Sequence, residues 1–83
     1  KVDDLALYQL FACPFCVKTR RAMHRLNVDI EKRDIKHDQN RAALEAQGGR
    51  VKVPCLKIGK GDDAKWLYES SDIIAYLDEI VAA

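Results

Sequence analysis

Two cysteines separated by two residues form the part of this sequence with the clearest chemistry. Cys13 and Cys16 stand in the run Ala-Cys-Pro-Phe-Cys, between an apolar stretch and residues with helical spacing. If Cys13 lies at the start of a helix, the backbone N–H groups and the positive end of the helix dipole favour its thiolate, which is the reactive form of cysteine. The spacing therefore predicts a pair of thiols that exchange with disulfides.

The two sulfur atoms are expected to differ in exposure. Cys13 precedes the regular helix and is predicted to face solvent, whereas Cys16 begins the apolar stripe and is predicted to be sheltered. We therefore expect Cys13 to be the nucleophile and Cys16 to be the resolving thiol. Lys18 and Arg21 add positive charge on the next turns and are expected to assist ionisation of Cys13. Phe15, between the cysteines, is a candidate contact for a disulfide substrate.

The cysteine pair also has two other interpretations, as ordinary buried thiols or as metal ligands. Structural zinc usually has four ligands, and the remaining candidates are Cys55, His24 and His37, none at the spacing of paired ligands. The sequence therefore predicts no metal site. Cys55 is expected to be a small buried hydrophobic side chain.

Composition narrows the class of protein. The 83 residues carry 14 basic and 13 acidic side chains, for a net charge of +1, which argues against non-specific binding of nucleic acid because that needs a basic surplus. No apolar run approaches the ~20 residues of a membrane span, so we expect no membrane contact within this segment. Three cysteines without a visible secretory signal favour a reducing compartment. We expect a cytoplasmic monomer with a single domain over residues 1–83.

The pattern of apolar runs, glycines and prolines predicts seven elements. Pro14 fits the first turn of a helix, Asp38 fits an N-cap, and Ser70 or Ser71 fits the N-cap of the last helix. We expect strands over 5–11, 28–34, 51–58 (interrupted by Pro54) and 64–68, and helices over 14–26, 38–47 and 70–81. A parallel β-α-β unit followed by a hairpin and a covering helix predicts an α/β fold with a four-stranded mixed sheet between helices.

The run Cys13-Pro14-Phe15-Cys16, coming after a buried strand, resembles the active site of dithiol glutaredoxins, which is commonly Cys-Pro-aromatic-Cys. The resemblance covers nearly all 83 residues in the order of the elements. It implies a thioredoxin-like fold of order β-α-β-α-β-β-α, with glutathione as the electron donor and no tightly bound cofactor. It also implies that the partners are disulfide-containing or glutathionylated proteins.

Two further segments are similar to glutathione-binding parts of glutaredoxins and glutathione transferases. Both families carry a Val-Pro with a cis proline opposite the active-site cysteine, and this match implies that the backbone of Val53, before Pro54, pairs with the cysteinyl part of glutathione. The run Glu-Ser-Ser-Asp resembles the Glu-Ser of transferase N-terminal domains rather than the Gly-Gly-Cys-Asp of most glutaredoxins. This resemblance implies that Ser70 and Ser71 bind the γ-glutamyl end, with Asp72 in support.

Charged residues near these segments depart from the usual glutaredoxin pattern. Many glutaredoxins have a lysine shortly before the first cysteine, where this sequence has Leu-Phe-Ala at 10–12. The family also holds the glycyl carboxylate of glutathione with a basic or amide side chain near the proline loop. By that match Lys52 is the first candidate, followed by Arg50 and Gln47.

These observations predict a glutathione-dependent thiol–disulfide oxidoreductase that reduces protein or small-molecule disulfides through Cys13 and Cys16. Three alternatives stay open. The Glu-Ser run favours a glutathione transferase-like domain. An iron–sulfur cluster carrier would use Cys13 together with glutathione. A thioredoxin-type protein would reduce protein partners without glutathione.

Overall fold

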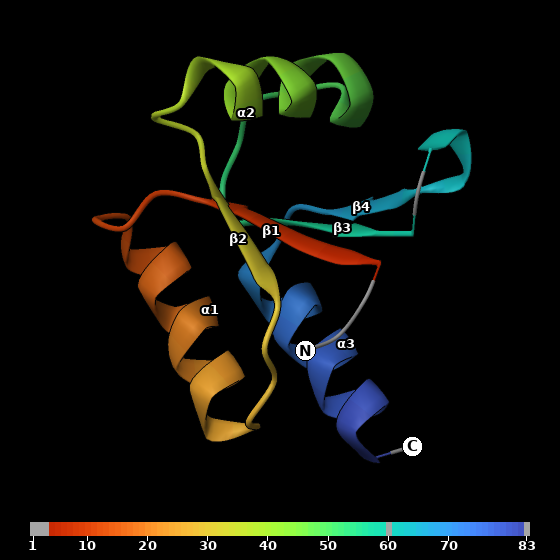
Figure 1. The fold of residues 1–83 in the computed structure, drawn as a ribbon. Helices are drawn as coiled ribbons and strands as arrows, with labels where there is room; N and C mark the ends of the chain where they lie inside the picture. Colours follow the sequence, from red (N-terminus) through yellow and green to blue (C-terminus); the bar gives the residue numbers. More distant parts are fainter. Residues whose placement is uncertain (1–3, 60, 83) are drawn as a thin grey trace.

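A four-stranded sheet forms the centre of the protein, with α2 on one face and α1 and α3 on the other (Figure 1). The computed structural model describes residues 4–59 and 61–82. The elements in chain order are β1 (Leu5–Gln9), α1 (Pro14–Arg25), β2 (Glu31–Asp34), α2 (Asp38–Ala43), the π-helical turn η1 (Leu44–Gly48), β3 (Cys55–Ile58), the 3-10 turn η2 (Gly61–Asp63), β4 (Lys65–Leu67) and α3 (Ser70–Ala82). No helix in these described ranges is long and apolar enough to cross a membrane.

The strands follow the order β2-β1-β3-β4 across the sheet. β1 pairs in parallel with β2 and antiparallel with β3, and β3 pairs antiparallel with β4. The predicted α/β fold, with its mixed four-stranded sheet and the order β-α-β-α-β-β-α, is therefore confirmed.

The central strand β1 is buried on both faces, as its unbroken apolar run predicts. Leu5 and Leu7 pack against the inner sides of α1 and α3, together with Met23, Ile73 and Leu77. Ala6 and Tyr8 face the other way, and pack with Leu44, Cys55 and the half-buried Val53 and Trp66 under α2. Because successive residues of a strand point to opposite faces, one five-residue strand joins both cores.

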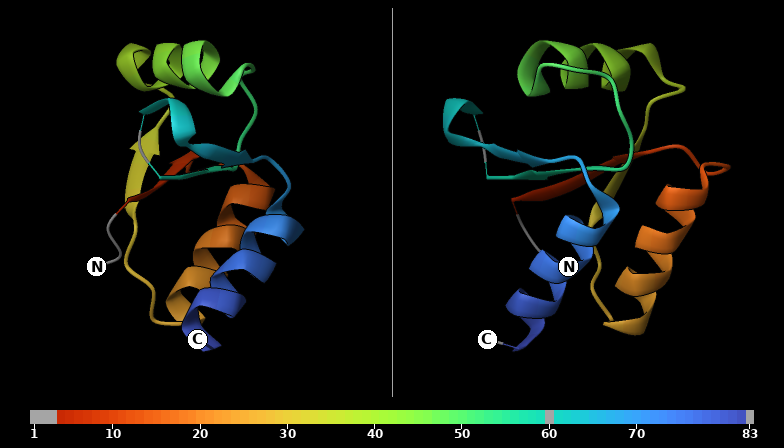
Figure 2. Two further views of the ribbon diagram at one scale, coloured as in Figure 1. Left: turned by 90° about the vertical axis from the view of Figure 1, so that its right-hand side faces the viewer. Right: turned by 180° about the vertical axis from the view of Figure 1, so that it is seen from behind.

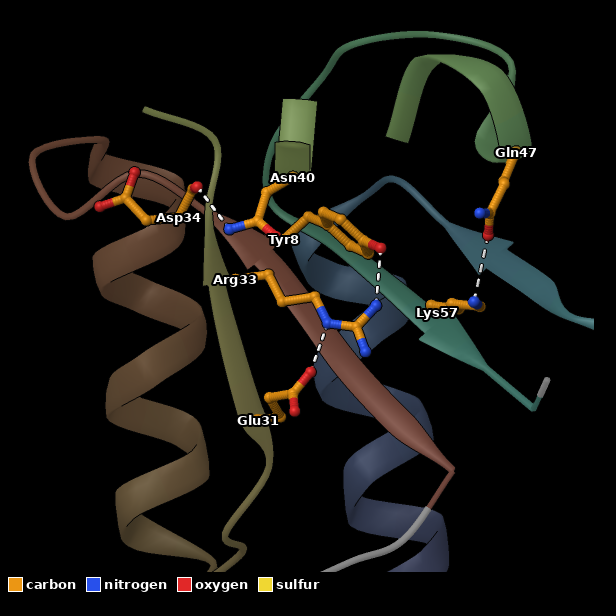
Figure 3. Close-up of polar contacts among 7 residues, drawn as sticks. All are labelled: Tyr8, Glu31, Arg33, Asp34, Asn40, Gln47 and Lys57. Atoms are coloured by element: carbon orange, nitrogen blue, oxygen red, sulfur yellow. Dashed lines mark hydrogen bonds and ion pairs between the residues drawn. The ribbon is translucent and has the colours of Figure 1, made fainter. Parts of the chain in front are cut away.

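Polar contacts at the edge of the sheet add to the packing of α2 (Figure 3). The Asn40 amide donates a hydrogen bond to the Asp34 carbonyl at 2.9 Å, and Lys57 Nζ on β3 donates to Gln47 Oε1 at 3.1 Å. Arg33 on β2 forms an ion pair with Glu31, and its guanidinium donates to the Tyr8 hydroxyl at 2.8 Å. The Asn40 and Gln47 contacts therefore hold the two ends of the α2–η1 segment over the sheet, and the Arg33 contacts link β2 to β1.

All four predicted strands are shorter in the structure, and the last covers Lys65–Leu67 instead of 64–68. The first ends at Gln9 instead of residue 11, because the chain turns and the Cys13 N–H donates to the Leu10 carbonyl at 3.3 Å. The second begins at Glu31 instead of residue 28, because the Val28 N–H still closes the end of α1 by bonding to the Met23 carbonyl at 2.9 Å. The third begins at Cys55 instead of residue 51, since proline at 54 has no N–H for the ladder.

The helix predicted over 38–47 changes character along its length. It is α-helical to Ala43 and π-helical from Leu44 to Gly48, and Gly49 ends it with a φ of 95°. A Cβ at Gly48 would overlap the Tyr68 hydroxyl, so the close approach of this turn to β4 requires glycine. The prediction that Asp38 is the N-cap is wrong: His37 holds that position without a side-chain cap, and Asp38 lies in the first turn.

The burial of α3 predicts unequal effects of two substitutions one turn apart. Leu77 is fully buried and Val81 is 47% exposed. Leu77→Ala should lower the free energy of unfolding by about 2–5 kcal/mol, because it leaves a cavity between α1, α3 and the sheet. Val81→Ala should change it by less than about 0.5 kcal/mol. Urea unfolding followed by circular dichroism measures both, and equal losses would contradict this packing.

Candidate active site at one edge of the sheet

The candidate residues lie at one edge of the sheet because of how its strands pair. Cys13 follows the end of β1, and Pro54 precedes the start of β3, where Tyr8 stands opposite Cys55 in an antiparallel register. The antiparallel hairpin brings the end of β4 back to the same edge, and Ser70 begins α3 there. Figure 2 shows the starts of α1 and α3 on this side of the molecule. Three segments far apart in the sequence therefore share one edge.

Cys13 occupies the N-cap position of α1, with Pro14 in the first turn as predicted. Its backbone is extended, with φ −70° and ψ 125°, and its carbonyl accepts the first helical hydrogen bond from Val17 N at 2.9 Å. The thiol is partly exposed, as expected. The reactive candidate thus lies where the unpaired N–H groups of a helix are concentrated.

Cys16 lies one turn into α1 and is fully buried, which agrees with the predicted shelter of this sulfur. Its Sγ accepts a hydrogen bond from the Leu10 N–H at 3.5 Å. Burial raises the pKa of Cys16 to about 11, and the neighbouring charge of Cys13 adds to this effect. Cys16 therefore keeps its proton at neutral pH.

The pKa of Cys13 is shifted in the other direction. Partial burial opposes its ionisation, but the nearby N–H groups of Cys16 and Phe15 and the Cys16 thiol, together with the charge of Arg20, outweigh that effect and bring the pKa of Cys13 below the ordinary cysteine value. A low-pKa thiol thus lies beside a high-pKa thiol. This is the arrangement that separates an attacking sulfur from a resolving one.

Arg20 is a functional candidate that the sequence reasoning missed. Its guanidinium donates to the Phe11 carbonyl at 2.8 Å, to the Leu10 carbonyl at 3.4 Å and to the side-chain carbonyl of the buried Gln9. It also lies over the Phe11 ring, 4.9 Å from its centroid. Arg20 therefore fixes the loop before Cys13 and acts on its pKa. The signal was available in the sequence, since Arg20 follows Cys13 by seven residues, which is two helical turns.

Lys18 and Arg21, which were expected to activate Cys13, are not among the groups that lower its pKa, and Arg20 is the basic residue that does so. They line a hollow between α1 and α3 together with Arg25 and Ile74. The reason is the rotation of α1: neighbouring positions along a helix face different directions.

The Val53-Pro54 peptide bond is cis, as the family resemblance implies. Pro54 is buried and Val53 is half-buried against the core under α2. Lys52, the first candidate for the glycyl carboxylate of glutathione, pairs with Glu69 instead, with 3.1 Å between Nζ and Oε1. This ion pair joins the proline loop to the residue before α3.

The second-choice residues for the glycyl carboxylate are also engaged. Arg50 lies over the Tyr68 ring, 4.4 Å from its centroid, while the Tyr68 hydroxyl donates to the Arg50 carbonyl at 3.1 Å. Gln47 accepts a hydrogen bond from Lys57. Tyr68 therefore fixes the course of the chain just before the proline loop.

The start of α3 leaves polar groups open. The prediction that Ser70 or Ser71 is the N-cap is wrong, because α3 begins at Ser70 and the Glu69 carbonyl accepts its first hydrogen bond, from Ile73 N at 3.0 Å. Within the described ranges neither serine hydroxyl makes a hydrogen bond to protein, and Asp72 is exposed in the same turn. Hydroxyl and N–H groups at a helix start can bind a carboxylate.

The remaining candidates fall into two groups. Phe15 is 61% exposed beside the cysteines, and Phe11 is 57% exposed on the preceding loop. Cys55 is fully buried, and this burial raises its pKa to about 11. In the part of the chain that the structure describes, no cluster of three or more histidine, cysteine or acidic side chains can hold a metal ion.

The contacts of Arg20 predict a shift in the ionisation of Cys13. Arg20→Ala should raise the pKa of Cys13, because a positive charge is lost and the loop carbonyls lose their donor. Alkylation of Cys13 at neutral pH should slow by about threefold to tenfold, and its pH profile should move to higher pH. Lys18→Ala is the matched control and should leave the profile in place. Superimposable profiles for Arg20→Ala and wild type would contradict this role.

The three thiols should differ in reactivity toward iodoacetamide. At pH 8 the native protein should be alkylated at Cys13 alone, since Cys16 and Cys55 are buried and have pKa values raised to about 11. Raising the pH toward 11 should increase modification of the latter two, and unfolding in urea should expose all three. Peptide mass spectrometry gives the order of modification. Early labelling of Cys55 would contradict its burial.

The sequence matches the model of the glutathione S-transferase N-terminal domain over residues 7–83. Glutaredoxin 2 of Escherichia coli (strain K12) is 29% identical over 76 residues, which cover 92% of this chain and 34% of that protein. The chain thus spans about a third of the length of this curated relative.

Solved structures show the same thioredoxin-like fold. Glutaredoxin 2 from Salmonella typhimurium, in complex with glutathione, superposes with a TM-score of 0.75 at 32% identity and covers 95% of this chain and 34% of that chain. Glutathione transferase Omega 1C from Trametes versicolor superposes with a TM-score of 0.82 at 16% identity, over 98% of this chain and 38% of that chain. With a match over residues 7–83, this chain belongs to the glutathione S-transferase N-terminal domain family.

Proposed function

We propose that this chain is a glutathione-dependent thiol–disulfide oxidoreductase that reduces glutathionylated proteins and small-molecule disulfides. The observation that carries the proposal is the placement of two thiols at the start of α1: Cys13 is partly exposed at the N-cap, and Cys16 is fully buried one turn later. The pKa shifts agree with this placement, since the pKa is lowered at Cys13 and raised at Cys16. The glutathione-bound relative from Salmonella supports glutathione as the partner. We also propose a cytoplasmic, reducing location, since three cysteines are too few for a disulfide-stapled scaffold.

The first step is attack by the Cys13 thiolate on the glutathione sulfur of a protein–glutathione disulfide. A new S–S bond joins Cys13 to glutathione, and the electron pair of the broken bond leaves on the protein sulfur, which takes up a proton. A second glutathione thiolate then attacks the glutathione sulfur on Cys13. This releases glutathione disulfide and restores the Cys13 thiolate. In sum, one mixed disulfide and one glutathione give a protein thiol and one glutathione disulfide.

Cys16 offers a second way to release the product. Once Cys13 is part of a mixed disulfide it is uncharged, so one of the effects that raise the pKa of Cys16 disappears. The Cys16 thiolate can then attack Cys13 Sγ, which expels glutathione as a thiol and closes the Cys13–Cys16 disulfide. Two further glutathione molecules reduce that disulfide.

Glutathione itself carries charges that fit the residues at this edge of the sheet. We propose that its γ-glutamyl carboxylate binds the open start of α3 at Ser70 and Ser71, and that the backbone of Val53 pairs with its cysteinyl part. The Lys52–Glu69 ion pair is half exposed and costs little to open. Its opening would free Lys52 for the glycyl carboxylate, as the resemblance implies.

The family match favours a second candidate, transfer of glutathione to an electrophile. In that reaction the glutathione sulfur forms a bond to carbon and no disulfide is involved. A conjugation assay with an electrophilic aryl halide distinguishes the two functions. Conjugation without reduction of hydroxyethyl disulfide would favour the transferase.

The roles of the two cysteines predict which variant traps glutathione. After treatment with oxidised glutathione, Cys16→Ser should carry one glutathione on Cys13, and the wild type should mainly close the Cys13–Cys16 disulfide. Intact and peptide mass spectrometry measures both products. Cys55→Ser is the matched control and should behave as the wild type, because Cys55 is fully buried.

Two results of that experiment would change the proposal. If Cys13→Ser reacts with oxidised glutathione as readily as the wild type, and Cys16→Ser does not react, the two roles are reversed. If none of the variants takes up glutathione, the oxidoreductase proposal fails.

A further inference from the structure

A hollow of about 420 Å³ lies between α1 and α3, on the face of the molecule away from α2. Val17 and Ala22 of α1 and Ile74 of α3 give it an apolar floor. Pro14 forms one end of the hollow, so it begins at the residue that follows Cys13. Whatever occupies this space therefore begins one residue along the chain from Cys13.

Three cations line the same hollow, and all three are exposed: Lys18, Arg21 and Arg25. We call the hollow with these three side chains the basic groove. None of the three makes a hydrogen bond or ion pair to another described residue. α1 contains no acidic residue, and Asp78, one turn after Ile74 on α3, forms no ion pair with the groove.

Several other cations of the protein are engaged, and unpaired ones among the described residues, such as Lys65, lie outside this hollow, so what sets the basic groove apart is that three unpaired cations lie together on one helix. Arg33 binds Glu31 and Tyr8, Lys57 binds Gln47 (Figure 3), and Lys52 binds Glu69. Repulsion between three like charges on one helix face is unfavourable when nothing neutralises them. The unpaired charges of the groove are therefore complementary to a negatively charged partner.

We propose that the basic groove docks an acidic segment of the protein substrate, next to the disulfide that reacts with Cys13. This inference rests on the proposed oxidoreductase function and deepens it by naming the class of protein substrate. The cations supply attraction for carboxylates, and the apolar floor supplies contact for a hydrophobic side chain between them. The residues proposed to hold glutathione lie outside the groove, and a small disulfide such as hydroxyethyl disulfide has no carboxylate to bind there, so we expect the groove to discriminate among protein substrates.

The spacing of the cations sets the length of the docked segment. Lys18 and Arg25 are seven residues apart on α1, or about 10 Å along the helix axis. An extended chain rises about 3.3 Å per residue, so about four residues of substrate span the three charges. We therefore expect the carboxylates to lie within about five residues of the reacting cysteine.

The test compares two glutathionylated peptides that are identical except that three positions near the cysteine carry Glu in one and Lys in the other. The wild type should reduce the acidic peptide with about tenfold higher kcat/KM, and this preference should weaken as salt is added. Arg25→Glu should lower the preference by about threefold, and Lys18→Glu/Arg21→Glu/Arg25→Glu should reverse it. Lys65→Glu, an exposed cation on β4, is the matched control and should keep it.

Two further measurements separate docking from chemistry. Reduction of hydroxyethyl disulfide by Arg25→Glu should equal that of the wild type, which shows that the variant is folded and active. Fluorescence anisotropy of the two labelled peptides with Cys13→Ser/Cys16→Ser reports docking without turnover, so failure of the proposed reaction is distinguishable from failure of the groove. Tighter binding of the acidic peptide is expected here too.

The proposal is overturned if the wild type binds and reduces both peptides equally, or if its preference survives in the triple variant. A second result would also overturn it: the wild type shows no peptide preference but binds phosphatidylserine vesicles, and the groove variants lose this binding. The groove would then face an anionic membrane. Loss of self-association in the same variants, again without peptide preference, would assign the groove to a second copy of the chain.

Discussion

The hydrogen bonding of β1 to both of its neighbours determines where the candidate functional residues lie. β1 is buried on both faces, and its side chains point alternately into the two cores. A shift of one residue in its register would exchange those faces, and would also move the loop to Cys13 away from the proline loop before β3. The burial that stabilises the sheet therefore also aligns the site.

The difference between the two thiols follows from their places on one helix. Cys13 stands outside the first turn, where N–H groups have no helical partner, and Cys16 stands one turn inside, on the face that packs against the sheet. A single turn of helix thus shifts the pKa values of two chemically equal side chains in opposite directions. Arg20, one turn further along the helix, binds the backbone carbonyls of the loop before Cys13, so the same helix also fixes the position of this loop.

The order of the elements and the different exposure of the two cysteines could be predicted from sequence, because periodicity and local motifs encode them. Strand ends were predicted less well, since residues 10–12 are turned by contacts to Cys16 and Arg20 that a local pattern does not contain. Arg20 was missed because neighbouring basic residues look equivalent until the rotation of the helix is known. Lys52 pairs with Glu69, 17 residues away, and such a tertiary contact has no local signal.

Gly48 shows how a position remote from both thiols can govern the chemistry. The turn at Gly48 leaves no space for a side chain against the Tyr68 hydroxyl, and that hydroxyl holds the carbonyl of Arg50 at the start of the proline loop. A larger residue there would displace the ring and let the segment leading to the cis proline drift. Natural variants at this glycine would then appear in a screen as defects in ligand recognition. The substituted residue nevertheless lies in the helical layer on the opposite face of the sheet from α1, which carries the reactive cysteines.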